Sequence, residues 1–237
     1  FFGFIFIMIF AAFYRFSDSA APMSLHEVVT YVWLQQIFLS FIMLWFRDNE
    51  IFALITGGGI AYELCRPAEL YPFWYSKLLA QRVSSAVLRC FPILAVVFAL
   101  PEPYRMGIPP SFGALLLFIA SLLLGLLVIV AISMLIYISV FWTMSPTGSL
   151  LMGSVAGEFL AGAVVPVPLM PEWMQRITYA LPFRWTTDFP FRVYSGHIPQ
   201  HEALWGILIQ LLWLAALIVI GRLLMKRALR NVVVQGG

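Results

Sequence analysis

Residues 47–82 read RDNEIFALITGGGIAYELCRPAELYPFWYSKLLAQR and lie between two strongly apolar runs. They include most of the acidic and basic residues of the first half of the chain and a glycine triplet at 57–59. We expect the helical part to end at Arg66-Pro67, because proline disfavours helix in the residue before it. A chain that only crosses a bilayer needs a short turn here. We therefore interpret 47–66 as an amphipathic segment that forms a docking surface on the cytoplasmic side of a membrane.

The composition of the chain indicates a membrane protein. Of its 237 residues, 62% are hydrophobic and 11% are charged, whereas soluble domains have about 25% charged residues. A spanning helix takes roughly 20 apolar residues, which leaves room for about six helices with loops. We predict an all-α integral membrane fold, a single transmembrane domain over 1–237 whose first helix is truncated at its start. The predicted spans are about 1–14, 26–46, 76–100, 112–142, 149–165 and 202–224.

A segment rich in proline and aromatic residues, 166–200, separates the last two predicted spans. It is too apolar for a free loop and too broken by proline for a spanning helix. Irregular backbone at membrane depth has to be covered by protein or face a cavity. We therefore expect short re-entrant or interfacial helices in this outer segment.

Lysine and arginine counts predict the orientation of the helices, because cytoplasmic loops are enriched in these residues. Segment 47–82 contains four of them and 222–230 contains another four. The opposite side has five, namely Arg15, Arg105, Arg176, Arg184 and Arg192. We expect a multi-pass membrane protein with a cytoplasmic C-terminus.

Motifs of enzymes and of cofactor-binding proteins are absent from the sequence. The glycine triplet is not followed by lysine and is no phosphate-binding loop. Cys65 and Cys90 have no metal-ligand spacing, and the three histidines form no zinc motif. We predict no catalytic residue, no metal ligand and no cofactor on this chain. We also predict no nucleic-acid partner, since no basic stretch is interleaved with aromatic residues.

Two charged residues fall near the middle of predicted spans. Arg89 precedes Leu100 by eleven residues, about 16 Å along a helix, and Glu158 lies nine residues into 149–165. Charges at that depth usually face a partner or a water-filled cavity. Our hypothesis is that one or both line a translocation path, with Arg89 and Glu158 as a pair. The alternatives are a structural ion pair, or an arginine that reaches the cytoplasmic headgroups.

The order of these features resembles a known family. The motif G-x-x-x-E-L-x-R-P at 59–67 follows the second span. A pattern of Gly162, Pro166 and Pro171, followed by Leu181-Pro182-Phe183, precedes the last span and its basic tail. Over nearly its whole length the chain resembles the permease subunits of type-two ABC exporters, in a bacterial branch of small permeases without a fused ATPase.

The resemblance implies partners for the chain. Two permeases would associate, as a homodimer or as a heterodimer with a sister permease. They would bind two copies of a separate ATP-binding subunit, which holds the ATP and Mg²⁺, and membrane lipid would surround them. Segment 47–66 would be the coupling helix, and the outer segment would help to close the outer end of the pathway. The outer gate residues would be Pro166, Pro171, Trp173 and Pro182.

The coupling segment offers a face for such a partner. Ile51, Leu54 and Ile55 are predicted to share an apolar stripe. The polar coupling residues expected beside it are Asp48, Glu50, Glu63 and Arg66. The alternative is a helix on the membrane surface that binds lipid headgroups, which the acidic residues disfavour because anionic lipids repel them.

The expected function is the membrane-spanning part of an ATP-driven exporter that works by alternating access and hydrolyses nothing itself. One alternative is a structural subunit of a membrane complex with no path of its own. Another is an ion-coupled carrier that uses Arg89 and Glu158. The resembled family handles drugs, lipids, glycans and peptides, so the substrate class stays open at this point.

Overall fold

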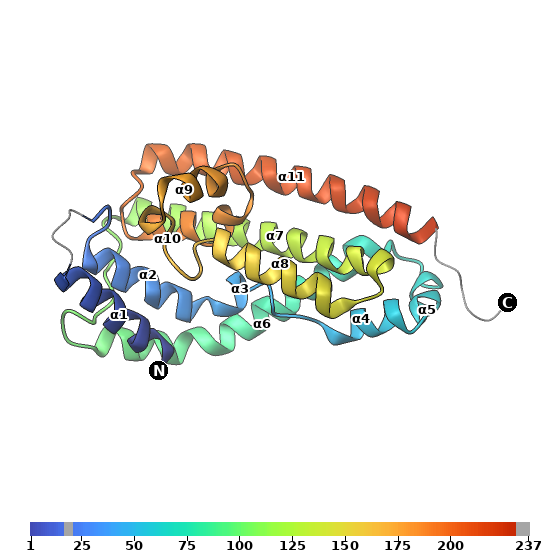
Figure 1. Ribbon diagram of the computed structural model, residues 1–237, viewed down its shortest axis with the longest axis horizontal. Helices are drawn as coiled ribbons and strands as arrows, with labels where there is room; N and C mark the ends of the chain where they lie inside the picture. Colours follow the sequence, from blue (N-terminus) through green and yellow to red (C-terminus); the bar gives the residue numbers. More distant parts are fainter. Residues whose placement is uncertain (17–20, 231–237) are drawn as a thin grey trace.

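The computed structural model describes residues 1–16 and 21–230, and every regular element in these ranges is a helix. Figure 1 shows an elongated bundle whose long helices follow its long axis. The helices of the first half are α1 (Phe2–Phe16), α2 (Leu25–Ile37), α3 (Leu39–Ile42), α4 (Asn49–Thr56), α5 (Ile60–Leu64) and α6 (Leu70–Ala99). Those of the second half are α7 (Phe112–Thr143), α8 (Pro146–Leu160), η1 (Val167–Leu169), α9 (Glu172–Tyr179), η2 (Phe183–Thr186), α10 (Asp188–Tyr194) and α11 (Gln200–Arg230).

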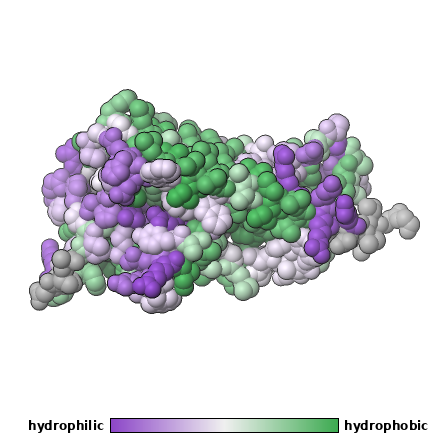
Figure 2. All heavy atoms as spheres, turned by 90° about the horizontal axis from the view of Figure 1, so that it is seen from above, coloured by the Kyte–Doolittle hydropathy of each residue, from purple (hydrophilic) through white to green (hydrophobic). Residues whose placement is uncertain are grey.

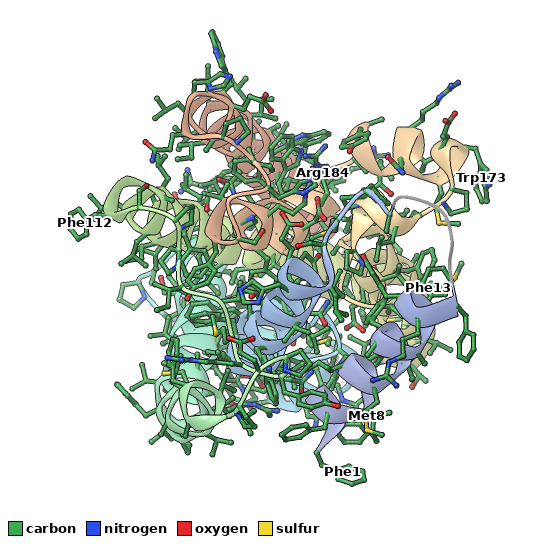
Figure 3. The ribbon with its side chains drawn as sticks, turned by 90° about the vertical axis from the view of Figure 1, so that its left-hand side faces the viewer. Phe1, Met8, Phe13, Phe112, Trp173 and Arg184 are labelled. Carbon is green, nitrogen blue, oxygen red and sulfur yellow. The ribbon has the colours of Figure 1, made fainter. Side chains whose placement is uncertain are left out.

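The surface of the bundle is that of a membrane protein. Three helices, α6, α7 and α11, are long and apolar enough to cross a bilayer. Figure 2 shows apolar residues over the middle of the molecule and hydrophilic residues gathered toward its two ends. Phe13, Phe112 and Trp173 project outward from the perimeter in Figure 3, and each is more than half exposed. The predicted all-helical membrane class is therefore confirmed.

Helix α7 lies at the centre of the bundle. It is apolar on all sides, which is typical of a helix buried within a larger protein. Val128, Val130 and Ala131 have no exposed surface. Helices α4, α6, α8, α10 and α11 all pack against α7, which gives the chain one shared core.

Three of the first four predicted spans, 1–14, 26–46 and 76–100, differ from the observed helices by two residues or more. The predicted 26–46 is two helices, α2 and α3, and the chain is not helical from 43 to 48. Helix α6 begins at Leu70, before the predicted 76, because Pro72 falls in the first turn, where its missing N–H is no loss. Helix α1 extends to Phe16, slightly beyond the predicted 1–14.

Helix α8 is shorter than the predicted span 149–165. Its 15 residues extend about 22 Å, less than the roughly 30 Å of a hydrocarbon core. After Leu160 the chain turns at Gly162, which has a left-handed φ of 77°. The carbonyl of Gly162 accepts hydrogen bonds from the Tyr31 hydroxyl at 2.9 Å and the Gln35 amide at 3.2 Å. Side chains of α2 thus supply hydrogen-bond donors for the non-helical backbone that follows α8.

Segment 166–200 forms short helices of two kinds. Helix α9 is amphipathic and exposes Trp173 and Ile177. Helix α10 is buried among α2, α7 and α11. Its first residue, Asp188, is fully buried and accepts a hydrogen bond from the Val167 N–H at 3.2 Å. The segment therefore folds back into the bundle, with α9 left at the surface.

The two ends of the bundle differ in what they contain. Helices α4 and α5, the turn between α7 and α8, and the end of α11 lie together at one end in Figure 1. The loop 100–111, helix α9 and the start of α11 lie at the opposite end. The predicted coupling segment and the end of the last helix are therefore at the same end of the molecule. We call this the α4–α5 end and the other the α9 end.

Gly206→Ala is expected to destabilise the fold. A Cβ atom at Gly206 would lie 2.1 Å from the Phe189 ring, so α10 and α11 would have to separate. Overpacking of this kind costs about 1–3 kcal/mol. The measurement is thermal unfolding of the purified chain in detergent. Gly148→Ala is the control, since its Cβ would meet only the Ser145 hydroxyl at 3.6 Å. Equal midpoints for the two variants would contradict the close contact.

Candidate functional site: the broken second helix and the coupling segment

The second helix of the bundle is interrupted inside the structure. Helix α3 ends at Ile42, and Met43 has an extended conformation with φ −83° and ψ 127°. The chain then runs without regular structure to Asp48, the N-cap of α4. A break leaves carbonyl groups on one side and N–H groups on the other without helical partners. We call residues 43–48 the break.

Arg82 of α6 satisfies the carbonyl side of the break. Its side chain is almost completely buried, with 1% of the residue exposed. The guanidinium donates to the carbonyls of Ser40 at 3.0 Å and Met43 at 2.8 Å, and to the Ser133 hydroxyl of α7 at 3.1 Å. Guanidinium presents several N–H donors in one plane. One side chain therefore joins α3, α6 and α7.

Glu158 of α8 satisfies the amide side of the break. Its Oε1 atom accepts hydrogen bonds from the N–H groups of Leu44 at 3.0 Å and Trp45 at 3.2 Å. The neighbouring Gly157 allows this approach, because a Cβ there would lie 2.4 Å from the Leu44 side chain. Glu158 therefore fixes the non-helical backbone of the break to α8.

Asp48 and Tyr137 connect the break to α4. The Tyr137 hydroxyl of α7 accepts a hydrogen bond from the Asp48 N–H at 2.6 Å. The Asp48 carboxylate caps α4 by accepting from the N–H of Glu50 at 2.9 Å. Lys77 of α6 pairs with both Asp48, at 3.0 Å, and Glu50, at 2.5 Å. The start of α4 is thus tied to α6 and α7.

The apolar stripe predicted for docking is directed largely into the bundle. Ile51 and Ile55 are buried, with 0% and 5% exposed, and only Leu54 of the three keeps partial exposure. The Phe52 ring lies 4.5 Å from that of Tyr137, so α4 packs on α7. Ile51 and Ile55 are therefore covered by the bundle in this conformation, because they form the contact between α4 and α7. Their part in coupling to an ATPase stays a prediction.

The exposed face of the segment comes mainly from α5 and the residues around it. Tyr62 is 81% exposed and Leu64 is 46% exposed. Glu63 is buried and pairs with the exposed Arg66 at 3.2 Å. The Arg66 guanidinium also lies over the Phe73 ring at 5.1 Å. We call Leu54, Tyr62, Leu64 and Arg66, together with the exposed Glu50, the α4–α5 face.

Arg89 and Glu158 do not form the predicted pair. Glu158 is bound to the break, whereas Arg89 Nε donates to the Gln36 carbonyl at 3.3 Å. Arg89 lines a groove of about 340 Å³ between α1, α2 and α6, with Trp33 and Pro92 among its walls. The pairing hypothesis is therefore corrected: the two charges bond to different parts of the backbone.

The predicted outer gate residues lie at the α9 end. Pro166 and Pro182 are buried and precede η1 and η2. Pro171 is exposed and precedes α9, and Trp173 is 62% exposed on that helix. Pro166 and Pro182 therefore lie in buried turns, whereas Pro171 and Trp173 lie at the surface helix α9.

Sequence reasoning missed Arg82 and Tyr137. Arg82 was counted among the cytoplasmic cations, yet it lies inside the bundle. A signal was present, because Leu78 and Ala86 are four residues away on either side and all three share the buried face of α6. Tyr137 had no comparable signal within an evenly apolar helix. Among the described residues, no group of three His, Cys, Asp or Glu side chains is arranged to hold a metal ion.

A comparison with protein families extends over almost the whole chain. The family model described as ABC-2 family transporter protein matches residues 2–236. No curated protein and no solved structure matches the chain.

Two replacements of Glu158 distinguish the effect of its hydrogen bonds from the effect of its negative charge. Glu158→Gln retains a carbonyl oxygen that accepts from Leu44 and Trp45, so the break should stay protected. Glu158→Leu removes the acceptor and leaves two N–H groups unpaired, a loss of about 1–3 kcal/mol. Amide hydrogen exchange over 43–48 should be about tenfold faster in the Leu variant and near the wild-type rate in the Gln variant. Equal exchange in both variants and the wild type would contradict these hydrogen bonds.

Arg82→Gln should destabilise the chain far more than Arg89→Gln. The first change removes the donors for buried carbonyls of the break, at about 1–3 kcal/mol. The second removes one hydrogen bond from a side chain at the exposed surface of α6. Thermal unfolding of both variants in the same detergent gives the comparison. A larger loss in Arg89→Gln would show that Arg82 does not hold the break.

Proposed function

The chain belongs to the ABC-2 family of transporter proteins, and we propose that it is the permease subunit of an ATP-driven exporter whose ATP is bound and hydrolysed by a separate subunit. One observation carries the proposal. The α4–α5 face lies at one end of the bundle, and α4 is joined directly to a break in a membrane helix. A force applied to that face would act on the membrane helices.

The path of such a force follows the contacts of α4. Ile51, Phe52 and Ile55 press on α7, so α4 cannot be displaced without moving its contact with that helix. The Tyr137 hydroxyl holds the Asp48 N–H, and Lys77 of α6 holds the Asp48 carboxylate. Displacement of α4 would therefore reach α6, α7 and the break together. Hinges that absorb such motion are short non-helical segments, which is what the break provides.

The docking surface is the α4–α5 face. Exposed aromatic and aliphatic side chains at the centre of an interface supply most of its binding energy. Tyr62 and Leu64 are of this kind, and Arg66 follows them in the chain as an exposed charge. In this proposal Ile51 and Ile55 transmit the motion within the chain and do not touch the partner. Two ATP-binding subunits would serve a pair of permeases, which is a homodimer or a heterodimer.

Six membrane crossings fit the arrangement of the helices. We assign them to α1, the pair α2–α3, α6, α7, α8 and α11. Helix α8 is short for a span, and the segment 161–170 would complete its crossing, since Tyr31, Gln35 and Asp188 satisfy its backbone. Segment 166–200 would close the outer end of the pathway.

The positions of the cations support an orientation with the α4–α5 end in the cytoplasm. Arg82 is buried at the break, and Arg184 and Arg192 lie inside the bundle near Asp188. Removing these three from the earlier counts leaves seven cations for the α4–α5 end and three for the other. Cytoplasmic ends carry the excess of Lys and Arg. The C-terminus would then be cytoplasmic and the membrane the bacterial inner membrane.

The double variant Tyr62→Ala/Leu64→Ala is expected to lose the partner. Truncation of central interface residues commonly costs about 1–2 kcal/mol or more, which is about 5- to 30-fold in affinity. The measurement is co-purification with a co-expressed ABC-type ATP-binding subunit, together with the ATPase activity of the complex. Phe112→Ala, an exposed residue at the α9 end outside segment 166–200, is the control and should retain both. Unchanged co-purification in the double variant, or equal loss in the control, would contradict the docking surface.

A further inference from the structure

A second pocket lies at the α9 end, away from the break and the α4–α5 face. It has a volume of about 270 Å³ and lies between η2, α10 and the start of α11. Phe189, Trp205 and Ile209 form apolar walls, and Arg184 and Glu202 supply opposite charges. In the view of Figure 3, Arg184 is seen between α9, which carries Trp173, and α11.

Arg184 is a buried arginine in the wall of this pocket. Only 9% of the residue is exposed, and its Nε has no hydrogen-bond partner in the described chain. The guanidinium is stacked on the rings of Tyr179, at 4.1 Å, and Trp185, at 4.5 Å. Stacking uses the faces of the guanidinium, whereas its five N–H donors lie in the plane. These donors remain available for an anionic group.

The nearest carboxylate is already engaged. Asp188 accepts from the Val167 N–H through Oδ1 and from Arg192 through Oδ2, each at 3.2 Å. Arg184 forms no salt bridge within the described residues, so the buried group of Arg184, Arg192 and Asp188 carries two positive charges and one negative charge. An isolated buried charge is costly unless a counter-ion reaches it. The pocket is the route by which such a group reaches Arg184.

The depth of the pocket matches that of lipid headgroups. From Ala203 to Gly221, helix α11 is apolar apart from Gln210. These 19 residues extend about 28 Å, close to the thickness of a hydrocarbon core. Glu202 therefore lies at the boundary between acyl chains and headgroups. Trp205 is 69% exposed directly below it, and Leu212, 63% exposed, continues the lipid-facing surface.

We propose that this pocket binds a phospholipid of the surrounding membrane with a primary-amine headgroup, such as phosphatidylethanolamine. Arg184 binds the phosphate, for which its planar fork of donors is suited. Glu202, at the rim of the same pocket, accepts hydrogen bonds from the ammonium group. The acyl chains lie along Trp205 and Leu212 of α11. A choline headgroup has no N–H to donate, and a glycerol headgroup has no positive charge for Glu202.

The site would attach a lipid at the joint between the outer segment and the last helix. Gln210 donates to the Trp185 carbonyl at 2.8 Å and to the Ser121 carbonyl at 2.9 Å, which fixes η2 against α7 and α11. Trp185 adjoins Arg184 in η2. A lipid bound by Arg184 would therefore contact η2, the same short helix that Gln210 bonds through the Trp185 carbonyl.

Native mass spectrometry of the purified full chain, without ATP or a partner subunit, tests the proposal. The probes are dioleoyl phosphatidylethanolamine, phosphatidylcholine and phosphatidylglycerol at equal concentrations. The wild type should retain one phosphatidylethanolamine about tenfold more than either other lipid. Arg184→Gln should lose this lipid about tenfold, and Glu202→Gln should lose the preference over phosphatidylcholine.

Two further variants test whether a loss of lipid binding is specific to Arg184 and independent of misfolding. Arg176→Gln, on the exposed face of α9, is the matched control and should retain the wild-type preference. Arg184→Lys keeps the charge without the planar fork and should bind at an intermediate level, which covers the case in which Arg184→Gln does not fold. Thermal unfolding of each variant monitors folding. Equal retention of the three lipids by the wild type, or an unchanged preference in both Arg184→Lys and Glu202→Gln, would overturn the proposal.

Discussion

Peptide groups inside a membrane have no water to bond, so each interruption of a helix needs partners from the protein. This constraint organises the structure. At the break in the second helix, Arg82 supplies donors for the carbonyls and Glu158 supplies an acceptor for the N–H groups. At 161–170, Tyr31 and Gln35 do the same for the end of α8. Each interrupted backbone is held by side chains from other helices, which joins them into one bundle around α7.

The same constraint changes the roles of the charged residues. A carboxylate near the middle of a membrane helix invites the interpretation of a transport pathway, but Glu158 is occupied by two backbone N–H groups. Arg82 is occupied in the same manner. Neither is free to bind a passing substrate while the break is held. Their position at a non-helical joint next to α4 instead favours a part in coupling, in which the break can rearrange when α4 is pushed.

We infer that the two ends of the molecule have different tasks. The α4–α5 face combines exposed apolar residues with charges outside the apolar band, as a surface for a protein partner requires. The α9 end places a stacked, unpaired Arg184 beside lipid-facing residues of α11, as a headgroup site requires. At the α4–α5 end Lys77 and Glu50 form an ion pair at the surface, whereas the buried Arg184 forms no salt bridge within the described residues.

The sequence by itself determined the membrane class and the family, because these follow from composition and from the order of motifs along the chain. The place of the coupling segment stays a prediction from that order. The sequence did not determine which charges are buried or what they bind. Arg82 and Arg89 are seven residues apart, two turns of α6, and so lie on nearly the same side of the helix. Arg82 faces the break and is buried there. Arg89 faces the end of α2, donates one hydrogen bond to the Gln36 carbonyl and stays exposed. Only the tertiary structure decided between them, because the difference lies in the backbone of the facing helix and not in α6.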